Sequence, residues 1–270
     1  MKILLNSTDL KKELKKQHGL GFVPTMGSIH KGHEYLISKS KEECPKTLVS
    51  IFINPKQFNN KSDLKNYPRN FKDDIRKLKR LKIDYVFLPD CKDIYRIKRK
   101  KKITLKKKNL ILCAQFRKGH FEGVLDIMDR FTKLINPKNI YMGEKDFQQF
   151  YLVKEYLQKR YNTKVIKCKT IRNVNNVALS SRNLLLSANS LKKASQIINE
   201  LKKIKKNLIN KTNFDDILNQ KIKYLENKFN IQIEYLELRN KNDLKKSLSF
   251  KNSKLFVAYY INKIRLIDNL

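Results

Sequence analysis

The chain of 270 residues has no tryptophan, only 7 glycines and 6 prolines, and 4 cysteines. The cysteines, Cys44, Cys91, Cys113 and Cys168, lie far apart, without a C-x-x-C pair. No histidine lies near them at a spacing that suits a zinc site. We therefore expect reduced thiols that take part in packing, as in a cytoplasmic protein.

Long hydrophobic runs are also missing. No stretch approaches the roughly 20 apolar residues of a membrane-spanning helix, and the apolar run at residues 3–5 is too short for a secretory signal. Hydrophobic residues still make up 40% of the chain, which is enough to build a core. We expect a soluble, folded, cytoplasmic protein that needs no membrane and whose length suits two domains.

Acidic residues are scarce, because 25 Asp and Glu stand against 61 Lys and Arg, which gives a formal net charge of +36. Such a charge is typical of nucleic-acid-binding proteins. A second interpretation is translated base composition: much Lys, Asn, Ile, Phe and Tyr with little Gly, Pro or Trp is what a strongly AT-biased genome encodes. In that case the densest basic run, residues 98–108, is a solvated loop or edge, and no nucleic acid is required for function.

Short apolar runs alternate with helical patterns through the first 170 residues. One helix is predicted from the apolar spacing between Val124 and Ile135, before Pro137, and another over 71–81 with Asn70 as its cap. This alternation predicts an α/β fold with a doubly wound parallel sheet, which binds ligands at the carboxyl ends of its strands. The predicted strands are Leu20–Val23, Leu48–Ile53, Tyr85–Leu88, Ile140–Met142 and Val165–Cys168.

The pattern changes after Arg182. Lysine-rich helical stretches at 190–209 and 213–228 precede strand-like runs at Ile231–Leu238 and Lys254–Tyr260, which predicts a smaller α+β domain. No linker rich in proline or glycine marks the join, and we find no internal repeat. We place the boundary near residue 170, with domains at 1–170 and 171–270.

The first candidate site is the segment PTMGSIHKGH, residues 24–33, between a predicted strand and the helical stretch 34–40. Gly27 and Gly32 allow the backbone to approach a triphosphate, and N–H groups at a helix start favour negative charge. The imidazoles of His30 and His33 can donate hydrogen bonds to phosphate oxygens. Spacing alone equally allows two surface histidines on a turn, and no third ligand nearby supports a metal site.

Two other segments carry candidate phosphate ligands. In GEKDFQQ, residues 143–149, Lys145 offers a positive charge, Asp146 is placed to cap the following helix, and Gln149 lies on the same helical face. In LSSRN, residues 179–183, hydroxyls and a guanidinium suit a segment that closes over phosphates. Taken singly, the first segment is better described as an ordinary charged turn and cap, and the second as a polar linker.

Polar residues at two other predicted strand or helix ends are candidates for substrate binding. Gln57 follows the strand at 48–53 and can hydrogen-bond a small substrate, whereas Arg117 precedes the helix at 122–135 and can pair with a carboxylate or phosphate. Either is also compatible with an ordinary loop.

Together and in this order, the segments closely resemble the pantothenate synthetase family, the pantoate:β-alanine ligases, over nearly the whole chain. The motifs are VPTMGSIHKGH, VSIFINPKQF, YPRNFKDDI, CAQFRKGHFEGV, IYMGEKDFQQ, ALSSRN and RLIDN. The resemblance implies a Rossmann-like domain that binds ATP and pantoate, a smaller C-terminal lid domain, Mg²⁺, and usually a homodimer. It also implies the condensation of pantoate with β-alanine to pantothenate through a pantoyl-adenylate, with release of AMP and pyrophosphate.

The resemblance further implies roles for individual residues. The expected catalytic residues are His33, His30, Lys145 and Arg182, and the expected substrate ligands are Gln57, Gln149 and Arg117. The expected ATP contacts are Met26, Gly27, Ser28, Ile29, His30, Lys31, Gly32, His33, Gly143, Glu144, Lys145, Asp146, Ile171, Leu179, Ser180, Ser181 and Arg182. The ligands of Mg²⁺ are not assigned.

The chain departs from the family pattern in three loops. Lys118 replaces a proline, Asn59-Asn60 replaces Gly-Pro, and Asn173, Asn175 and Asn176 stand where acidic residues and glycine are usual. These changes predict looser loops and a modest activity.

Two alternative functions compete with the one that this resemblance implies. The HxGH motif at residues 30–33 is shared with class I aminoacyl-tRNA synthetases and small nucleotidylyltransferases, but Gln57 and the GEKDFQQ segment, together with the absence of an anticodon-binding domain, disfavour them. A basic RNA-binding module explains the charge, yet it predicts an aromatic platform or basic stripe that we do not find.

Overall fold

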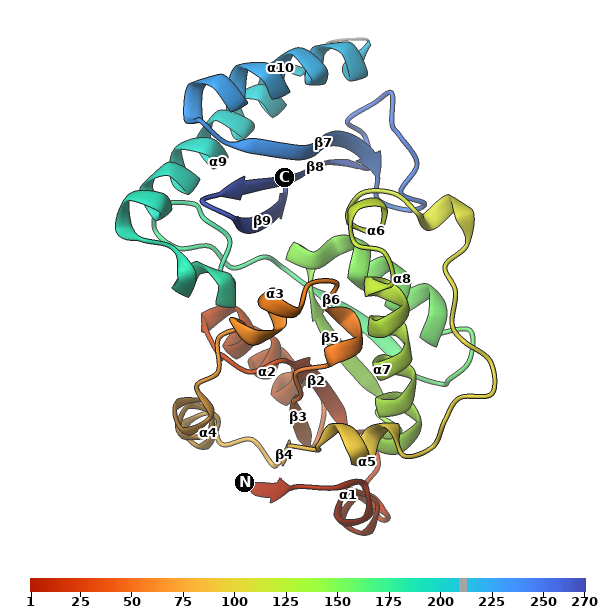
Figure 1. Ribbon diagram of the computed structural model, residues 1–270. Coiled ribbons are helices and arrows are strands. Elements are labelled where there is room, and N and C mark those ends of the chain that lie inside the picture. Colours follow the sequence, from red (N-terminus) through yellow and green to blue (C-terminus); the bar gives the residue numbers. More distant parts are fainter. Residues whose placement is uncertain (209–212) are drawn as a thin grey trace. The chain divides into compact units, whose positions relative to one another are not determined.

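The computed structural model describes residues 1–208 and 213–270. They form two compact units, each with its own sheet (Figure 1). The first unit comprises Met1–Leu110 and Arg117–Thr170, and the second comprises Ile111–Phe116 and Ile171–Leu270. The chain thus visits the second unit briefly at 111–116, an excursion that the sequence did not indicate.

The first unit is built on six parallel strands in the order β1-β4-β3-β2-β5-β6. The strand order reverses between β2 and β5, the kind of switch point at which doubly wound sheets bind ligands. The strands are β1 (Lys2–Leu4), β2 (Gly21–Thr25), β3 (Thr47–Ile51), β4 (Tyr85–Phe87), β5 (Asn139–Gly143) and β6 (Lys164–Cys168). The helices are α1 (Ser7–Leu14), α2 (Lys31–Glu43), η1 (Pro55–Gln57), α3 (Lys61–Lys65), α4 (Phe71–Arg80), α5 (Cys91–Tyr95), η2 (Lys107–Asn109), α7 (His120–Ile135), η3 (Glu144–Asp146) and α8 (Phe147–Leu157).

Helices cover both faces of this sheet because successive strand side chains point to opposite sides. Phe22 on β2 meets Phe131 of α7 with ring centroids 5.8 Å apart, and α7 packs beside α8 on that face (Figure 1). The next residue, Val23, faces a separate core with Ile37 of α2 and Leu78 of α4. The prediction of a doubly wound parallel sheet is therefore confirmed.

Local sequence patterns predicted the ends of the helices better than the edge strand of the sheet. The Asn70 side chain accepts a hydrogen bond from the Asp73 amide at 3.3 Å, which confirms the predicted cap of α4. α7 ends where Asn136 adopts the left-handed conformation, directly before Pro137. The edge strand β1 was missed, because its three residues are too few to show an alternating pattern.

The second unit has an antiparallel sheet in the order β7-β8-β9. Its elements are α6 (Cys113–Phe116), η4 (Ser181–Leu185), α9 (Ala188–Leu208), α10 (Phe214–Phe229), β7 (Gln232–Asn240), β8 (Ser253–Ile261) and β9 (Ile264–Asn269). Apolar residues of both long helices, including Ile197 and Leu225, pack with Leu236 and Val257 of the sheet. The predicted α+β arrangement is confirmed, although β9 was not predicted, and residue 209 of the predicted helix at 190–209 lies outside the described residues.

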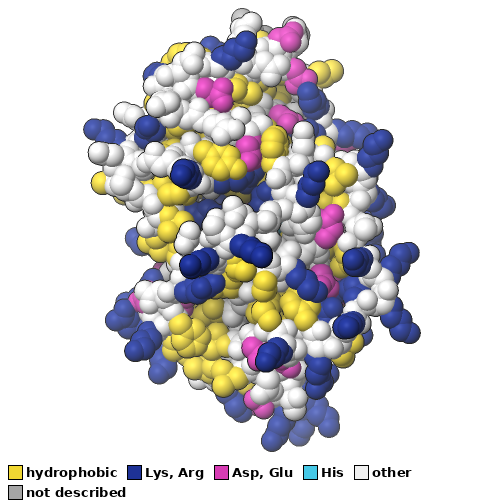
Figure 2. Space-filling model, viewed as in Figure 1, with side chains coloured by type: hydrophobic (Ala, Val, Ile, Leu, Met, Phe, Trp, Pro, Cys, Tyr) yellow, Lys and Arg dark blue, Asp and Glu magenta, His cyan; other side chains and the backbone are white. Residues whose placement is uncertain are grey.

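The basic residues and the cysteines lie as expected. Lys and Arg side chains are scattered over the face shown in Figure 2 and form no single stripe there. The run 98–108 is a mostly exposed loop that contains only the short helix η2. The four cysteines, all in the described part of the chain, are free thiols, and three of them are buried. Among residues 1–208 and 213–270, no helix is long and apolar enough to cross a membrane.

Candidate active site

Three loops of the first unit follow neighbouring strands and meet at one edge of the sheet. β3, β2 and β5 are adjacent and parallel, so the segments after their carboxyl ends are adjacent as well. These segments carry Gln57 after β3, residues 26–33 after β2, and Gly143 to Gln149 after β5. The sheet thus brings together three motifs that are separated in the sequence.

The loop after β2 is fixed by a carboxylate from α4. Asp74, which is 2% exposed, accepts the amide protons of Ser28 at 2.8 Å and Ile29 at 2.6 Å. Gly27 has a φ of +82°, and a Cβ there would lie 2.9 Å from an Asp74 oxygen. The Gly27 amide donates to the Thr25 hydroxyl at 3.2 Å. Glycine is therefore required at position 27 by the protein's own packing, whatever the ligand.

Asp74 is a functional candidate that the sequence alone does not single out. It lies in the motif YPRNFKDDI, but two adjacent aspartates on a charged helix look alike in sequence. The structure separates them, because Asp73 pairs with Arg76 and Lys77 at the surface while Asp74 is buried. Lys77 also donates to the Ile29 carbonyl at 2.7 Å, so α4 holds both backbone polar groups of Ile29.

His30 and His33 are stacked at the start of α2, with ring centroids 4.0 Å apart. Nδ1 of His30 accepts from the Gly32 amide at 3.1 Å, and Nδ1 of His33 accepts from the His30 amide at 3.4 Å. A neutral imidazole that accepts at Nδ1 carries its proton at Nε2. We infer that each ring presents an Nε2–H donor.

Both histidines are held in the neutral form at pH 7. Burial, followed by the Lys145 ammonium, lowers the pKa of His30 to about 4. Burial also lowers the pKa of His33 well below its ordinary value, with the positive charges of His30 and Lys145 adding to the effect. The influence of Lys145 on both rings indicates that the loops after β2 and β5 share one electrostatic environment.

The loop after β5 supplies further charge. Lys145 is largely buried, with its side chain 17% exposed, and its ammonium lies 3.5 Å from an Asp146 oxygen. Glu144 pairs with Lys167 at 3.1 Å, whereas Gly143 ends the strand with open space around its Cα. Asp146 occupies the N-cap position of α8, but its side chain makes no capping bond, so the predicted cap is wrong. Its carboxylate is directed elsewhere and is 47% exposed.

Gln57 lies in a buried turn that is held against α7. Its amide nitrogen contacts the Met26 sulfur of the loop after β2, and its amide oxygen lies 3.4 Å from the Asn54 side chain. Asn54 is 1% exposed, donates to the Gly123 carbonyl at 3.0 Å and accepts from the Tyr95 hydroxyl at 2.7 Å. Asn54 therefore ties the turn to both α5 and α7.

Arg117 and His120 hold the same turn through hydrogen bonds to its backbone. His120 is buried, with Nδ1 2.6 Å from the Gln57 carbonyl oxygen, to which Arg117 also donates at 3.4 Å. Lys118, one of the departures from the family pattern, has its carbonyl bonded by the side chain of Asn59, another departure. The Asn59 side chain thus links the two loops by a hydrogen bond, whereas Lys118 contributes only a backbone carbonyl, which a proline would also offer.

The remaining predicted residues of the first unit lie on the first turns of helices or in the loop between β2 and α2. Lys31 begins α2 with an exposed side chain, while Gly32 and His33 follow it, partly buried. Gln149 is in the first turn of α8 and is partly buried. Met26 is also partly buried, whereas Ser28 and Ile29 are buried and serve mainly to shape the loop.

Five predicted ATP contacts belong to the second unit. Ile171 accepts from the Leu179 amide at 2.9 Å, and the Ser180 hydroxyl accepts from the Arg182 amide at 3.3 Å. Ser181 is buried and begins η4. Ile171, Leu179 and Ser180 therefore lie on the segment that leads into η4, and Ser181 and Arg182 are the first residues of η4.

The asparagines that replace acidic residues and glycine stabilise this loop. The Asn173 side chain accepts the amide protons of Asn175 and Val177, each at 3.0 Å. Asn176 adopts a φ of 66°, a left-handed conformation that asparagine tolerates better than most residues. These contacts show how the asparagines are accommodated in the loop, and the loop stiffness predicted from these departures stays a prediction.

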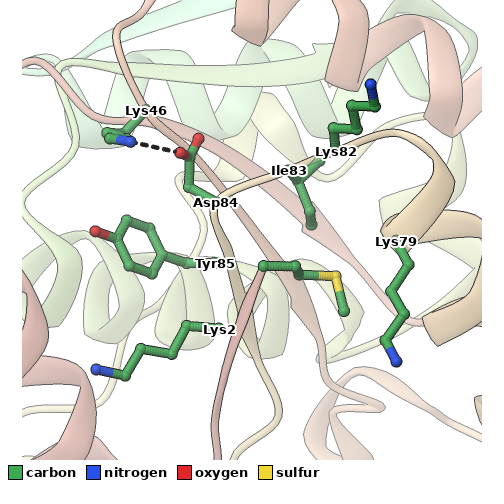
Figure 3. A pocket seen from close by; sticks show the side chains of 8 residues that line it. Lys2, Lys46, Lys79, Lys82, Ile83, Asp84 and Tyr85 are labelled. Carbon is green, nitrogen blue, oxygen red and sulfur yellow. Dashed lines mark ion pairs between the residues drawn. The ribbon is translucent and has the colours of Figure 1, made fainter.

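A hollow of the first unit, half of whose eight lining residues are lysines, lies near the amino ends of the strands, opposite the candidate site (Figure 3). Lys46 and Asp84 precede β3 and β4 and pair at 2.9 Å. The side chains of Lys2, Lys79 and Lys82 point away from one another, so their charges do not converge on a ligand (Figure 3).

In residues 1–208 and 213–270, no cluster of three or more His, Cys, Asp or Glu residues could hold a metal ion by itself.

Known proteins share this architecture along its full length. The sequence model of the pantoate-beta-alanine ligase family matches residues 2–270. A pantothenate synthetase from Flavobacterium psychrophilum is 39% identical over 269 residues, which cover 97% of this chain and 95% of the relative.

Two solved structures are similar throughout. Pantothenate synthetase from Thermus thermophilus matches with a TM-score of 0.89 at 27% identity, covering 100% of this chain and 99% of that one. A pantoate-beta-alanine ligase from Francisella tularensis, complexed with beta-gamma ATP and beta-alanine, matches with a TM-score of 0.84 at 34% identity, covering 100% and 97%. With the motifs brought to one sheet edge as described, this chain belongs to the pantoate-beta-alanine ligase family, the pantothenate synthetases.

Proposed function

We propose that this chain condenses pantoate with β-alanine at the expense of ATP, through a pantoyl-adenylate. The observation that carries the proposal is the stacked pair His30 and His33 at the start of α2, where each Nδ1 accepts a backbone amide proton and each Nε2 is left to donate, at the switch point of the sheet. Donors that are fixed before the reaction stabilise charge that develops on phosphate oxygens. Family membership names the substrates, and the ATP and β-alanine bound to the Francisella relative support the assignment.

The first step transfers the adenylyl group. A pantoate carboxylate oxygen attacks the α-phosphorus of ATP, and the bond from that phosphorus to the bridging oxygen breaks, so that pyrophosphate leaves. Nε2–H of His30 and His33 donates to phosphate oxygens, while Lys145 and Arg182 balance the negative charge. Gln57 and Gln149 hold pantoate in line, and Arg117 is a further candidate for binding a carboxylate.

The second step forms the amide. The β-alanine nitrogen attacks the activated carbonyl carbon, the bond to the AMP oxygen breaks, and the nitrogen loses a proton as pantothenate and AMP are released. An acyl-adenylate is prone to hydrolysis, so we assign Ser180, Ser181 and Arg182 to a lid that excludes water. Ile171 and Leu179 would flank the nucleotide in that lid.

The first unit fits a Mg²⁺ ion that is held mainly by ATP. Mg²⁺ commonly uses one or two carboxylates together with substrate phosphates, and the half-exposed Asp146 carboxylate beside Lys145 and His30 is suited to this use. When bound, the ion would neutralise phosphate charge.

The remaining ATP contacts in the first unit are proposed at residues 26–33 and 143–146. The family resemblance also favours a homodimer in the cytoplasm, without a nucleic-acid or membrane partner.

Exchange of labelled pyrophosphate into ATP tests the order of these steps. The protein, given pantoate and Mg²⁺ without β-alanine, should catalyse this exchange, because adenylation needs no amine. His33→Ala should remain folded by circular dichroism and lose exchange by on the order of 100-fold, the effect of removing one fixed donor to a charged transition state. His18→Ala, at an exposed position outside the site, is the matched control and should retain full exchange.

Two results would contradict the proposal. One is full-rate pantothenate formation without pantoate-dependent exchange of pyrophosphate into ATP, under conditions in which the release of pyrophosphate from the enzyme is shown to be reversible. The other is a His33→Ala enzyme that keeps more than about a tenth of the wild-type rate, a loss of less than roughly 1.4 kcal/mol of transition-state stabilisation.

A further inference from the structure

The C-terminal motif RLIDN has no role in the proposed chemistry, yet it ends in a buried ion pair. Asp268 on β9 accepts from both terminal nitrogens of Arg172, at 2.7 and 2.8 Å. The Asp268 side chain is 3% exposed and that of Arg172 20%. A bidentate pair of this kind fixes the direction of the guanidinium as well as its distance.

Arg172 also closes the hairpin that carries the proposed lid residues. Its guanidinium donates to the Asn176 carbonyl at 2.9 Å, and its backbone forms a bridge with Ala178. The Leu179 amide then bonds to the Ile171 carbonyl at 2.9 Å. Arg172 therefore lies at the base of the hairpin, directly before the Ser180–Arg182 segment.

The other side of the hairpin is held by α9. The Ser195 hydroxyl donates to the Asn175 carbonyl at 2.8 Å, and the Lys202 ammonium donates to the Asn176 side chain at 2.7 Å. These two contacts are exposed and hence individually weak, whereas the pair with Asp268 is buried. The contact with Asp268 is therefore the one among these three that is both bidentate and shielded from water.

We propose that Asp268 and Arg172 are positioning residues, which hold the hairpin 171–179 on the C-terminal sheet so that Ser180, Ser181 and Arg182 meet ATP in one fixed arrangement. The proposal rests on the proposed function, since it assigns the three lid residues to ATP. A buried ion pair is weak support for a purely stabilising role, because its desolvation cost offsets much of its attraction. If the pair instead fixes the position of the hairpin, its loss should weaken the binding of ATP in particular.

A second buried pair in the same sheet provides a matched control. Arg265 on β9 donates twice to Glu234 on β7, at 2.6 and 2.9 Å, and the two side chains are 12% and 9% exposed. This pair does not contact the hairpin in any described interaction. Asp268→Asn and Glu234→Gln each remove one buried negative charge and preserve side-chain size.

The test measures the KM of each substrate, kcat and thermal stability for both variants. Asp268→Asn should raise the KM for ATP by about tenfold or more, with a smaller change in the KM for pantoate. Glu234→Gln should lose comparable stability but keep its KM for ATP within about twofold. Arg172→Lys, which keeps the charge and loses the fork, should share the defect of Asp268→Asn.

The possible failures are distinguishable. If the wild-type protein forms no pantothenate from ATP, pantoate and β-alanine, the proposed function is wrong. If the wild-type is active and Asp268→Asn or Arg172→Lys loses only stability, or Glu234→Gln raises the KM for ATP equally, the positioning role is overturned. Should Asp268→Asn not fold, the KM of Arg172→Lys for ATP decides the question alone.

Discussion

At the scale of single residues, the neutral state of the two histidines decides what they can do. Charged imidazoles would attract phosphate at a distance, but neutral ones act only through a directed Nε2–H. Burial and the nearby Lys145 remove the charge, and the Nδ1 contacts fix the tautomer. The positive charge of the site is therefore left to lysine and arginine.

This state has a measurable effect on stability. The folded pKa of His30, about 4, lies below its ordinary value of 6.5, so between these values the unfolded chain binds a proton that the folded protein does not. The unfolding free energy should fall as pH falls through this window and level off below it. His30→Asn keeps an acceptor for the Gly32 amide but cannot titrate, so its stability should fall less steeply.

Urea unfolding of both proteins, from about pH 7 to about pH 4, measures the difference. Carboxylates titrate in both proteins and cancel in the comparison. If the unfolding free energy depends on pH equally in both proteins, His30 is not kept neutral by the fold.

At the scale of elements, the contact between η1 and α7 determines where Gln57 lies. The two elements touch at Gly123, where an added Cβ would lie 2.3 Å from the Lys56 carbonyl oxygen. No side chain fits in that space, so the backbone of the turn rests directly on the helix. Asn54, Arg117 and His120 then fix the turn from either side.

Gly123→Ala should therefore displace the turn. We expect a destabilisation of about 1–3 kcal/mol from overpacking, together with a higher KM for pantoate because Gln57 moves. Gly143→Ala is the control for stability alone, since a Cβ at that position meets nothing within 4 Å. A Gly123→Ala protein with wild-type stability and KM would show that the contact is not as close as described.

At the scale of the whole molecule, the charge of +36 is separate from the proposed chemistry. The basic run 98–108 is an exposed loop, and Arg99, its partly buried member, pairs with Asp126 and Asp129 of α7. None of these residues belongs to the proposed site.

Replacement of Lys100, Lys101, Lys106 and Lys107 by glutamine tests this separation. Because these charges are exposed and screened by salt, turnover at saturating substrates should stay within about twofold of wild type. A large fall in turnover with the fold preserved would show that the loop takes part. Nanomolar, salt-dependent RNA binding that the variant loses would restore the RNA-binding interpretation.

Features that are local in the chain could be predicted from the sequence alone. Strand and helix periods, the cap at Asn70 and the order of the motifs predicted the doubly wound sheet, the α+β second unit and the family. These predictions succeeded because burial leaves a short-range pattern along each element. The start of α2 and the loop after β5 were located for the same reason.

Contacts between side chains that are distant in the sequence could not be predicted, because they follow from the three-dimensional fold. Asp74 binds an amide 46 residues away, and Asp268 pairs with an arginine 96 residues away. Nothing in the local pattern distinguishes Asp74 from Asp73, or gives RLIDN a partner. Such pairings depend on which loops the sheet order brings together, and the neutral state of the histidines depends on the burial that follows.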